Sequence, residues 1–76
     1  MNPTLRHLRV FLSLAQSLNF SPTAEEFFLT QPSFRKFVRD LEEELGVMLF
    51  HRTTRSVRLT SEGEGLLPLA RQVVSE

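Results

Sequence analysis

Residues 30–46 read TQPSFRKFVRDLEEELG, and they contain the start, the apolar seam and the end of one helix. Thr30 is a hydroxyl residue of the kind that caps helices, and Pro32 is tolerated in a first turn, where backbone N–H groups lack intrahelical partners. Apolar residues then recur at steps of four, three and four: Phe34, Val38, Leu41 and Leu45. Gly46 is the residue type that commonly follows a helix end. The pattern predicts a helix over about 31–45.

A second, shorter helix is predicted immediately upstream. Ser21 and Pro22 repeat the signal of a cap followed by proline, and the helix that they open runs to about Phe28. A tight turn joins this helix to the one at 31–45, and two helices joined in this way form the outline of a helix-turn-helix.

Residues 4–18 are predicted to form the first helix. Its apolar residues share one stripe, which is expected to face the core: Leu5, Leu8, Leu12 and Ala15. Val10 and Leu14 interrupt the otherwise polar opposite side, so a further element is expected to pack there as well. His7 is expected on the polar or boundary side of this helix.

The periodicity changes after the glycine at 46. Residues 49–52 and 57–59 are short segments compatible with strands, and they flank a polar turn at 53–56. They predict a small β-hairpin over 49–59, the wing.

A fourth helix is predicted from Ser61, because Ser61 and Glu64 have the spacing of a capping box. Its apolar stripe consists of Leu66, Leu67, Ala70, Val73 and Val74. Pro68 leaves a kink or a later start of this helix open. The predicted fold class is therefore mainly α, a winged helix-turn-helix with three helices, a small hairpin wing and the start of a further helix.

The formal net charge is zero, which by itself argues mildly against nucleic-acid binding. The charges are segregated, however. Two clusters of basic residues contain no acid: Arg35, Lys36 and Arg39, and Arg52, Arg55 and Arg58. The acids gather elsewhere, and those at 40–44 are interpreted as solvated surface groups. A neutral total is therefore compatible with a basic face.

The helix at 31–45 carries the strongest functional signal. Helical geometry leaves four residues on the side opposite its seam: Pro32, Lys36, Arg39 and Glu43. Gln31 and Ser33 project from the first turn, where polar side chains can meet base edges in the major groove. The basic residues suit phosphates: Arg35, Lys36 and Arg39. On this pattern alone, a solvated helix face with the ion pairs Lys36–Asp40 and Arg39–Glu43 stays open as an alternative.

Other chemistries are not supported by the sequence. The chain has no cysteine, which excludes disulfides and thiolate metal sites and fits a reducing cytoplasm. His7 and His51 are too few and too far apart to suggest zinc, and each is interpreted as a surface or phosphate-contacting residue. No spacing joins a nucleophile to a base, so neither an enzyme nor a metal or cofactor is expected. Polar and basic residues within the first apolar stretch argue against a signal peptide or a membrane span.

Six segments together resemble the N-terminal domain of LysR-type transcriptional regulators: LRHLRVF at 5–11, NFS at 19–21, TQPSF at 30–34, DLEEELGV at 40–47, LFHR at 49–52 and VRLT at 57–60. The resemblance covers almost the whole chain. It implies a bacterial, cytoplasmic regulator that binds double-stranded DNA as a homodimer or higher homo-oligomer, each subunit reading half of an interrupted inverted repeat.

The resemblance also implies how the chain is divided. Residues 1–60 would form the winged helix-turn-helix domain, and residues 61–76 would begin a dimerisation linker helix, against which Val10 and Leu14 could pack. The family's C-terminal domain senses a small-molecule inducer. That effector domain is absent from these residues, so the sequence looks like a fragment of a longer regulator.

The same resemblance implies which residues contact DNA. Residues 31–33 would approach the bases, and Lys36 stands in place of the family's usual phosphate-contacting Arg. Arg52 and Thr53 would anchor the wing. The complete expected set is Ser21, Thr30, Gln31, Pro32, Ser33, Arg35, Lys36, Arg39, Arg52, Thr53, Thr54 and Arg55.

Three residues depart from the family pattern inside the helix expected to read DNA, and the first, Phe34, replaces a common Leu. Arg35 stands where Ser is usual, and the added charge is expected to raise affinity for DNA in general. Phe37 stands where a polar residue is usual and lies about sixty degrees from the seam. It is expected either to widen the core contact or to present an aromatic ring beside the groove.

The sequence leaves two functions open. The first is sequence-specific binding of double-stranded DNA, with the helix at 31–45 in the major groove and the wing at 49–59 on the flanking backbone or minor groove. The alternative is a winged-helix protein-interaction module without DNA affinity, which the zero net charge and the additional Phe residues favour. A face shared by Lys36, Arg39 and Arg52 would favour DNA.

Overall fold

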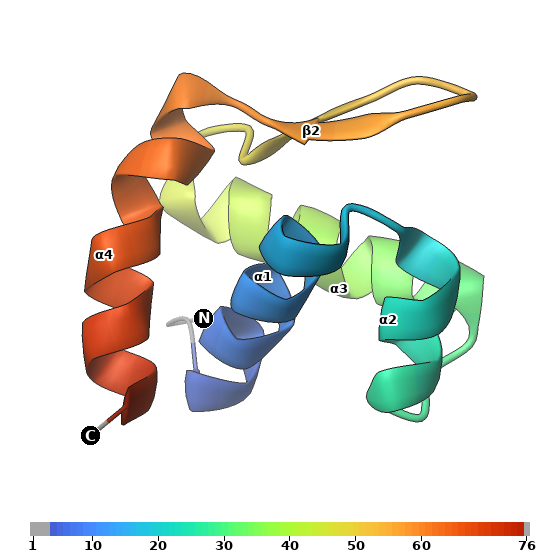
Figure 1. The fold of residues 1–76 in the computed structure, drawn as a ribbon, viewed down its shortest axis with the longest axis horizontal. Coiled ribbons are helices and arrows are strands. Elements are labelled where there is room, and N and C mark those ends of the chain that lie inside the picture. Colours follow the sequence, from blue (N-terminus) through green and yellow to red (C-terminus); the bar gives the residue numbers. More distant parts are fainter. Residues whose placement is uncertain (1–3, 76) are drawn as a thin grey trace.

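The structure, a computed structural model, describes residues 4–75, which form four helices and one two-stranded hairpin (Figure 1). In chain order the elements are α1 (Leu5–Ser17), α2 (Phe20–Glu26), α3 (Gln31–Leu45), β1 (Phe50–Arg52), β2 (Val57–Leu59) and α4 (Ser61–Ser75). α1 contacts α2, α3 and α4, and the hairpin extends along one side of the helices (Figure 1). This architecture confirms the predicted mainly α winged helix-turn-helix.

α1 begins with a reciprocal cap between Thr4 and His7. The Thr4 hydroxyl oxygen accepts from the backbone N–H of His7 (3.3 Å), and the His7 ring accepts from the backbone N–H of Thr4 (3.1 Å). The His7 ring is buried and stacks on Phe37, with the ring centroids 4.3 Å apart. The prediction of a surface or phosphate-contacting His7 was therefore wrong, because the cap turns the ring inward onto an aromatic partner.

The apolar stripe predicted for α1 is not its most buried side, so that prediction was wrong. The fully buried apolar residues of this helix are Val10, Phe11 and Leu14. Leu5 is exposed, whereas Leu12 and Ala15 are half-buried and line a groove with Leu67 of α4. Leu12 and Ala15 thus lie toward α4, whereas Leu5 lies beside the end of α2. Val10 and Leu14 are buried in one cluster with Ala70 of α4, as expected for a side of α1 that a further element covers. Because α1 is covered on more than one side, its amphipathic pattern alone did not identify the core face.

α2 begins two residues earlier than predicted. Its cap is Asn19, whose side-chain oxygen accepts from the backbone N–H of Ser21 (3.3 Å). The prediction of Ser21 as the cap was wrong because Phe20 is buried and forms the first residue of the helix. After the helix ends, Phe28 adopts a left-handed backbone conformation (φ 58°) and is 94% exposed.

α3 has the predicted bounds. Thr30 caps it by accepting a hydrogen bond from the backbone N–H of Ser33 (3.3 Å), and Gly46 ends it with φ 73°, a conformation that glycine adopts without strain. The buried apolar residues of its seam are Phe34, Val38 and Leu41. Phe37 is half-buried and packs against the core, which confirms the first of the two placements predicted for it.

The predicted hairpin is also present. β1 and β2 pair antiparallel, with Phe50 opposite Leu59 and Arg52 opposite Val57. Phe50 is buried and packs against Phe11 of α1, with the ring centroids 5.7 Å apart. The hairpin is therefore attached to the helical core through its first strand.

α4 begins at Ser61, and its cap is Thr60, one residue before the predicted cap. The Thr60 hydroxyl accepts from the backbone N–H of Gly63 (3.0 Å) and donates to the carbonyl oxygen of Met48 (2.6 Å). The predicted capping box from Ser61 was wrong, because Thr60 occupies the cap position and is held there by its hydrogen bond to the backbone of Met48. The helix runs to Ser75 without interruption at Pro68. No helix within residues 4–75 is long and apolar enough to cross a lipid bilayer.

Candidate nucleic-acid interface

The outer side of α3 is exposed along its N-terminal half, as the sequence predicted. Residues 31–33 are all exposed in the first turn, and Thr30, also exposed, fixes the start of that turn through its cap. Lys36 and Arg39 are exposed on the following turns. No acidic residue lies in the first turn of α3. This end of the helix therefore presents amide, hydroxyl and cationic groups to solvent.

Lys36 forms an ion pair with Asp40 one turn further along α3, with 2.9 Å between Nζ and Oδ2. This is the pair that the sequence offered as an alternative role for Lys36. The Lys36 side chain is nevertheless 74% exposed. Exposed pairs of this spacing contribute only about 0.3–0.5 kcal/mol, so a phosphate can replace Asp40 as the partner at little cost.

The tip of the wing is a tight turn organised by Thr53. Its backbone N–H donates to the carbonyl oxygen of Ser56 (2.9 Å), and its hydroxyl oxygen accepts from the backbone N–H groups of Arg55 (3.2 Å) and Ser56 (3.0 Å). Thr54 and Arg55 are exposed at the tip. The structure thus gives Thr53 a role in shaping the turn that presents its two neighbours.

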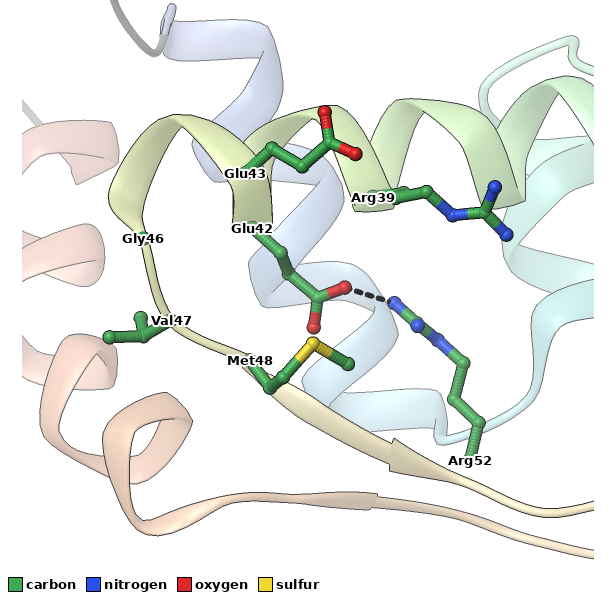
Figure 2. A pocket seen from close by; sticks show the side chains of 7 residues that line it. All are labelled: Arg39, Glu42, Glu43, Gly46, Val47, Met48 and Arg52. Atoms are coloured by element: carbon green, nitrogen blue, oxygen red, sulfur yellow. Dashed lines mark hydrogen bonds and ion pairs between the residues drawn. The ribbon is translucent and has the colours of Figure 1, made fainter.

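Arg52 is tied to α3 by a buried carboxylate (Figure 2). Glu42 is 3% exposed and accepts from Arg52 Nη2 (2.6 Å) and from the backbone N–H groups of Leu49 (2.7 Å) and Phe50 (3.1 Å). The interpretation of Glu42 as a solvated acid was wrong, because three donors from the start of the hairpin surround it. The Glu42 carboxylate balances the charge of Arg52, whose side chain is only 23% exposed.

A groove of about 350 Å³ lies between the C-terminal half of α3 and the start of the hairpin (Figure 2). Its lining residues are Arg39, Glu42, Glu43, Gly46, Val47, Met48 and Arg52. Arg39 and Arg52 therefore border the same depression, although they come from different elements. Lys36 does not line it.

A second depression, here called the α2–wing cleft, lies between the starts of α2 and α3 and the tip of the wing. It measures about 270 Å³, and its lining residues are Leu18, Asn19, Phe20, Ser21, Gln31, Arg35, Thr53, Thr54, Arg55, Ser56 and Val57. Six of the twelve residues expected to contact DNA meet here, and none of the lining residues is acidic. The cleft thus combines two guanidinium groups with several hydroxyl and amide groups.

Arg35 enters this cleft from α3 and lies over the ring of Phe20, with 4.3 Å between the guanidinium carbon and the ring centroid. Arg52 lies 5.8 Å from the same centroid. Phe20 was not among the residues predicted to contribute to the site, because the predicted helix began after it, at Ser21 and Pro22. An aromatic residue directly before the predicted cap was the available signal.

The part of the chain that the structure describes contains no group of three or more His, Asp or Glu residues that could hold a metal ion. The arrangement of these residues is suited to binding an anionic surface.

Comparison with known proteins identifies a family pattern over most of the chain. Residues 5–64 match the model of a family described as bacterial regulatory helix-turn-helix protein, lysR family. The Hca operon transcriptional activator HcaR of Escherichia coli (strain K12) is 44% identical over 72 residues, which are 95% of this chain and 24% of HcaR. This chain spans about a quarter of the length of most curated relatives that it matches.

Solved structures of two similar proteins contain DNA. A BenM DBD complex with catB site 1 DNA matches with a TM-score of 0.86 and 35% identity, over 95% of this chain and 80% of that one. The structure of Vibrio fischeri DarR in complex with DNA matches with a TM-score of 0.91 and 37% identity, over 99% of this chain and 26% of that one. The four helices and the hairpin of residues 4–75 therefore have an arrangement that is also found in proteins whose structures were solved in complex with DNA.

Proposed function

Because this chain belongs to the lysR family of bacterial regulatory helix-turn-helix proteins, we propose that it binds double-stranded DNA as the DNA-binding part of a transcription regulator. The observation that carries the proposal is the exposed N-terminal half of α3, free of acidic residues, beside a wing tip that also lacks them. The likeness to two structures solved with DNA supports it. The relatives are regulators of transcription and not enzymes.

In this proposal α3 lies in the major groove with its N-terminal turn against the base edges. Gln31 can bond an adenine through two contacts, and Ser33 can bond several bases more weakly. Pro32 shapes the same exposed turn. The cap at Thr30 supports this assignment, because it holds the reading side chains on a rigid helix start.

The basic side chains beside this turn, together with the Ser21 hydroxyl, would contact phosphates and fix the register on the duplex. Lys36 and Arg39 would do so from the outer side of α3, and Ser21 and Arg35 from the α2–wing cleft. At the wing, Thr54 and Arg55 would reach the flanking backbone or the minor groove. Arg52 and Thr53 would act mainly by holding the wing in place, given the ion pair and the turn that they form.

We further propose that residues 61–76 begin a linker helix through which two copies dimerise, and that residues 1–60 form the DNA-binding unit. Residues 1–3 and 76 of these two segments lie outside the described residues. Leu69 and Val73 of α4 are exposed apolar side chains that a second copy would cover. A dimer would read an interrupted inverted repeat with half-sites about 34 Å apart, or a multiple of that spacing.

Membership of the family extends the proposal to a whole regulator. The relatives of this chain are about four times as long as it is, and we propose that a regulator containing this chain also has a C-terminal domain that binds a small-molecule inducer. A regulator of this kind acts in the bacterial cytoplasm.

A fluorescence-anisotropy titration with a pool of random duplexes, at two salt concentrations, tests DNA binding. We expect affinity that falls steeply with salt, because phosphate contacts release counterions. The same titration on the chain joined to a dimeric coiled coil controls for weak dimerisation. No binding by either form at low salt would contradict the proposal and favour the protein-interaction module.

A further inference from the structure

The α2–wing cleft contains two guanidinium groups, those of Arg35 and Arg55, and neither forms an ion pair within the described residues. Within residues 4–75, Lys36 forms an ion pair with Asp40 and Arg52 with Glu42, and no ion pair involves Arg35. The Arg35 guanidinium is exposed to the cleft, whose lining contains no acid. Its charge is therefore available to an anion from outside the chain.

Phe20 holds this guanidinium in place. A guanidinium carbon 4.3 Å from the ring centroid is well within the range of a cation–π contact. Phe20 is itself 5% exposed and packs edge-on against Phe34 of α3, with the centroids 5.8 Å apart. A stacked guanidinium on a fixed ring loses less rotational freedom on binding than a free side chain does.

The other groups of the cleft suit the oxygens of a phosphate. Ser21, Thr54 and Arg55 are exposed side chains that can donate hydrogen bonds, and they come from the start of α2 and the tip of the wing. A guanidinium binds phosphate oxygens through two parallel hydrogen bonds. The cleft therefore offers donors from three elements around one small depression.

We propose that the α2–wing cleft binds one phosphate of the DNA backbone, and that Phe20 positions Arg35 for this contact. The inference rests on the proposed function: with α3 in the major groove and the wing beyond it, the backbone strand between them passes over the cleft. Arg35 binds the phosphate, and Phe20 is a positioning residue that touches no DNA.

The first test compares Arg35→Gln with Arg9→Gln, which removes the same charge from an exposed position of α1 outside the cleft. The probe is a pool of random duplexes. For Arg35→Gln we expect roughly tenfold or weaker binding at low salt and a slope of log affinity against log salt reduced by about 0.9. Arg9→Gln should change neither quantity appreciably.

The role of Phe20 is tested by a double-mutant cycle on the same probe. Phe20→Leu should weaken binding in the wild-type background and have no further effect in the Arg35→Gln background. Circular dichroism at the titration temperature establishes that each variant is folded. Arg35→Lys leaves the core untouched: it should keep the salt slope but bind several-fold more weakly, because an ammonium does not stack as a planar group does.

Four results would overturn the inference or its positioning step. If Arg35→Gln leaves affinity and slope unchanged while Lys36→Gln lowers both, the cleft binds no phosphate although the proposed function stands. If Arg35→Gln alters the preference at one base pair and leaves binding to the random pool unchanged, Arg35 reads a base. Additive losses for Phe20→Leu and Arg35→Gln would remove the positioning role. A wild-type chain without salt-dependent binding would overturn the proposed function as well.

Discussion

The backbone of Gly63 lies directly against the carbonyl oxygen of Leu49. A Cβ atom at position 63 would overlap that oxygen and would stand 2.8 Å from Cδ2 of Leu59. The first turn of α4 is thus packed on Leu49, directly before β1, and on Leu59 of β2 through a residue without a side chain. This contact sets the position of α4 relative to the wing.

Gly63→Ala should therefore destabilise the domain by about 1–3 kcal/mol, as overpacking in a core does. Gly65 supplies the matched control, because a Cβ there meets nothing within 4 Å. Gly65→Ala should stabilise the domain by about 0.5–1 kcal/mol through its higher helix propensity. Thermal unfolding followed by circular dichroism measures both, and equal shifts for the two variants would argue against the close contact.

Phe28→Asn should raise the stability of the domain. Phe28 is 94% exposed and has φ 58°, a conformation that costs an ordinary residue about 1–2 kcal/mol and that Asn tolerates better. A gain of about 1 kcal/mol corresponds to roughly 4–8 °C in Tm for a domain of this size. Phe27→Asn is the control and should lower Tm, because Phe27 packs against Phe34. A lower Tm for Phe28→Asn would show that the ring makes a stabilising contact.

Glu42→Gln should cost about 3–5 kcal/mol, the range measured when one partner of a buried ion pair is removed. The substitution leaves Arg52 without its carboxylate and weakens the bonds from two backbone N–H groups. Glu43→Gln removes the same charge from an exposed neighbour and should change stability by less than about 0.5 kcal/mol. Urea unfolding at neutral pH distinguishes the two, and a loss below 1 kcal/mol for Glu42→Gln would contradict the assigned role.

Glu62 should make stability depend on acid pH. Its own backbone N–H and the Ser61 hydroxyl donate to the carboxylate and hold its pKa below the ordinary value of 4.5. A lowered pKa in the folded state means stability that is present above pH 4.5 and lost as the pH falls through the folded-state value. Glu62→Gln should therefore flatten the acid side of the stability–pH curve. Unfolding measured between pH 3 and pH 6 checks this, and an unchanged curve would exclude the contribution.

Gln31→Ala and Lys36→Ala should affect DNA binding in different ways. Gln31→Ala should cost roughly 1–3 kcal/mol at one base pair of the selected operator and little on random duplexes. Lys36→Ala should weaken binding to every sequence and reduce the salt slope by about 0.9. Anisotropy titrations on operator and random duplexes separate the two effects. Equal losses on both probes for Gln31→Ala would exclude base reading by this residue.

Local signals were sufficient to predict every helix and the hairpin, because caps, glycine and apolar spacing act within one or two turns. Cap residues were less predictable where two polar candidates stand close together. Asn19 rather than Ser21 caps α2, and Thr60 rather than Ser61 caps α4, since burial of neighbouring residues decides between them. The prediction of which side of α1 faces the core was wrong for a related reason, because several elements cover that helix.

The candidate site was predictable to the extent that helical geometry determines exposure. The outer side of α3 follows from its seam, so Gln31 and Lys36 were placed correctly on the surface. The ion pair between Glu42 and Arg52 was not predicted, because these residues are ten positions apart and meet only where the hairpin packs against α3. The contact of Arg35 with Phe20 likewise joins two helices, so the spacing of residues within one helix does not predict it.

The buried carboxylate of Glu42 also determines how the wing unfolds. A ladder of three residue pairs is too short to be stable by itself in water. The N–H groups of Leu49 and Phe50 are instead bonded to a side chain of α3, so they are released only when that helix separates from the hairpin. The base of the wing therefore belongs to the same cooperative unit as the helical core, while the exposed tip can open locally without it.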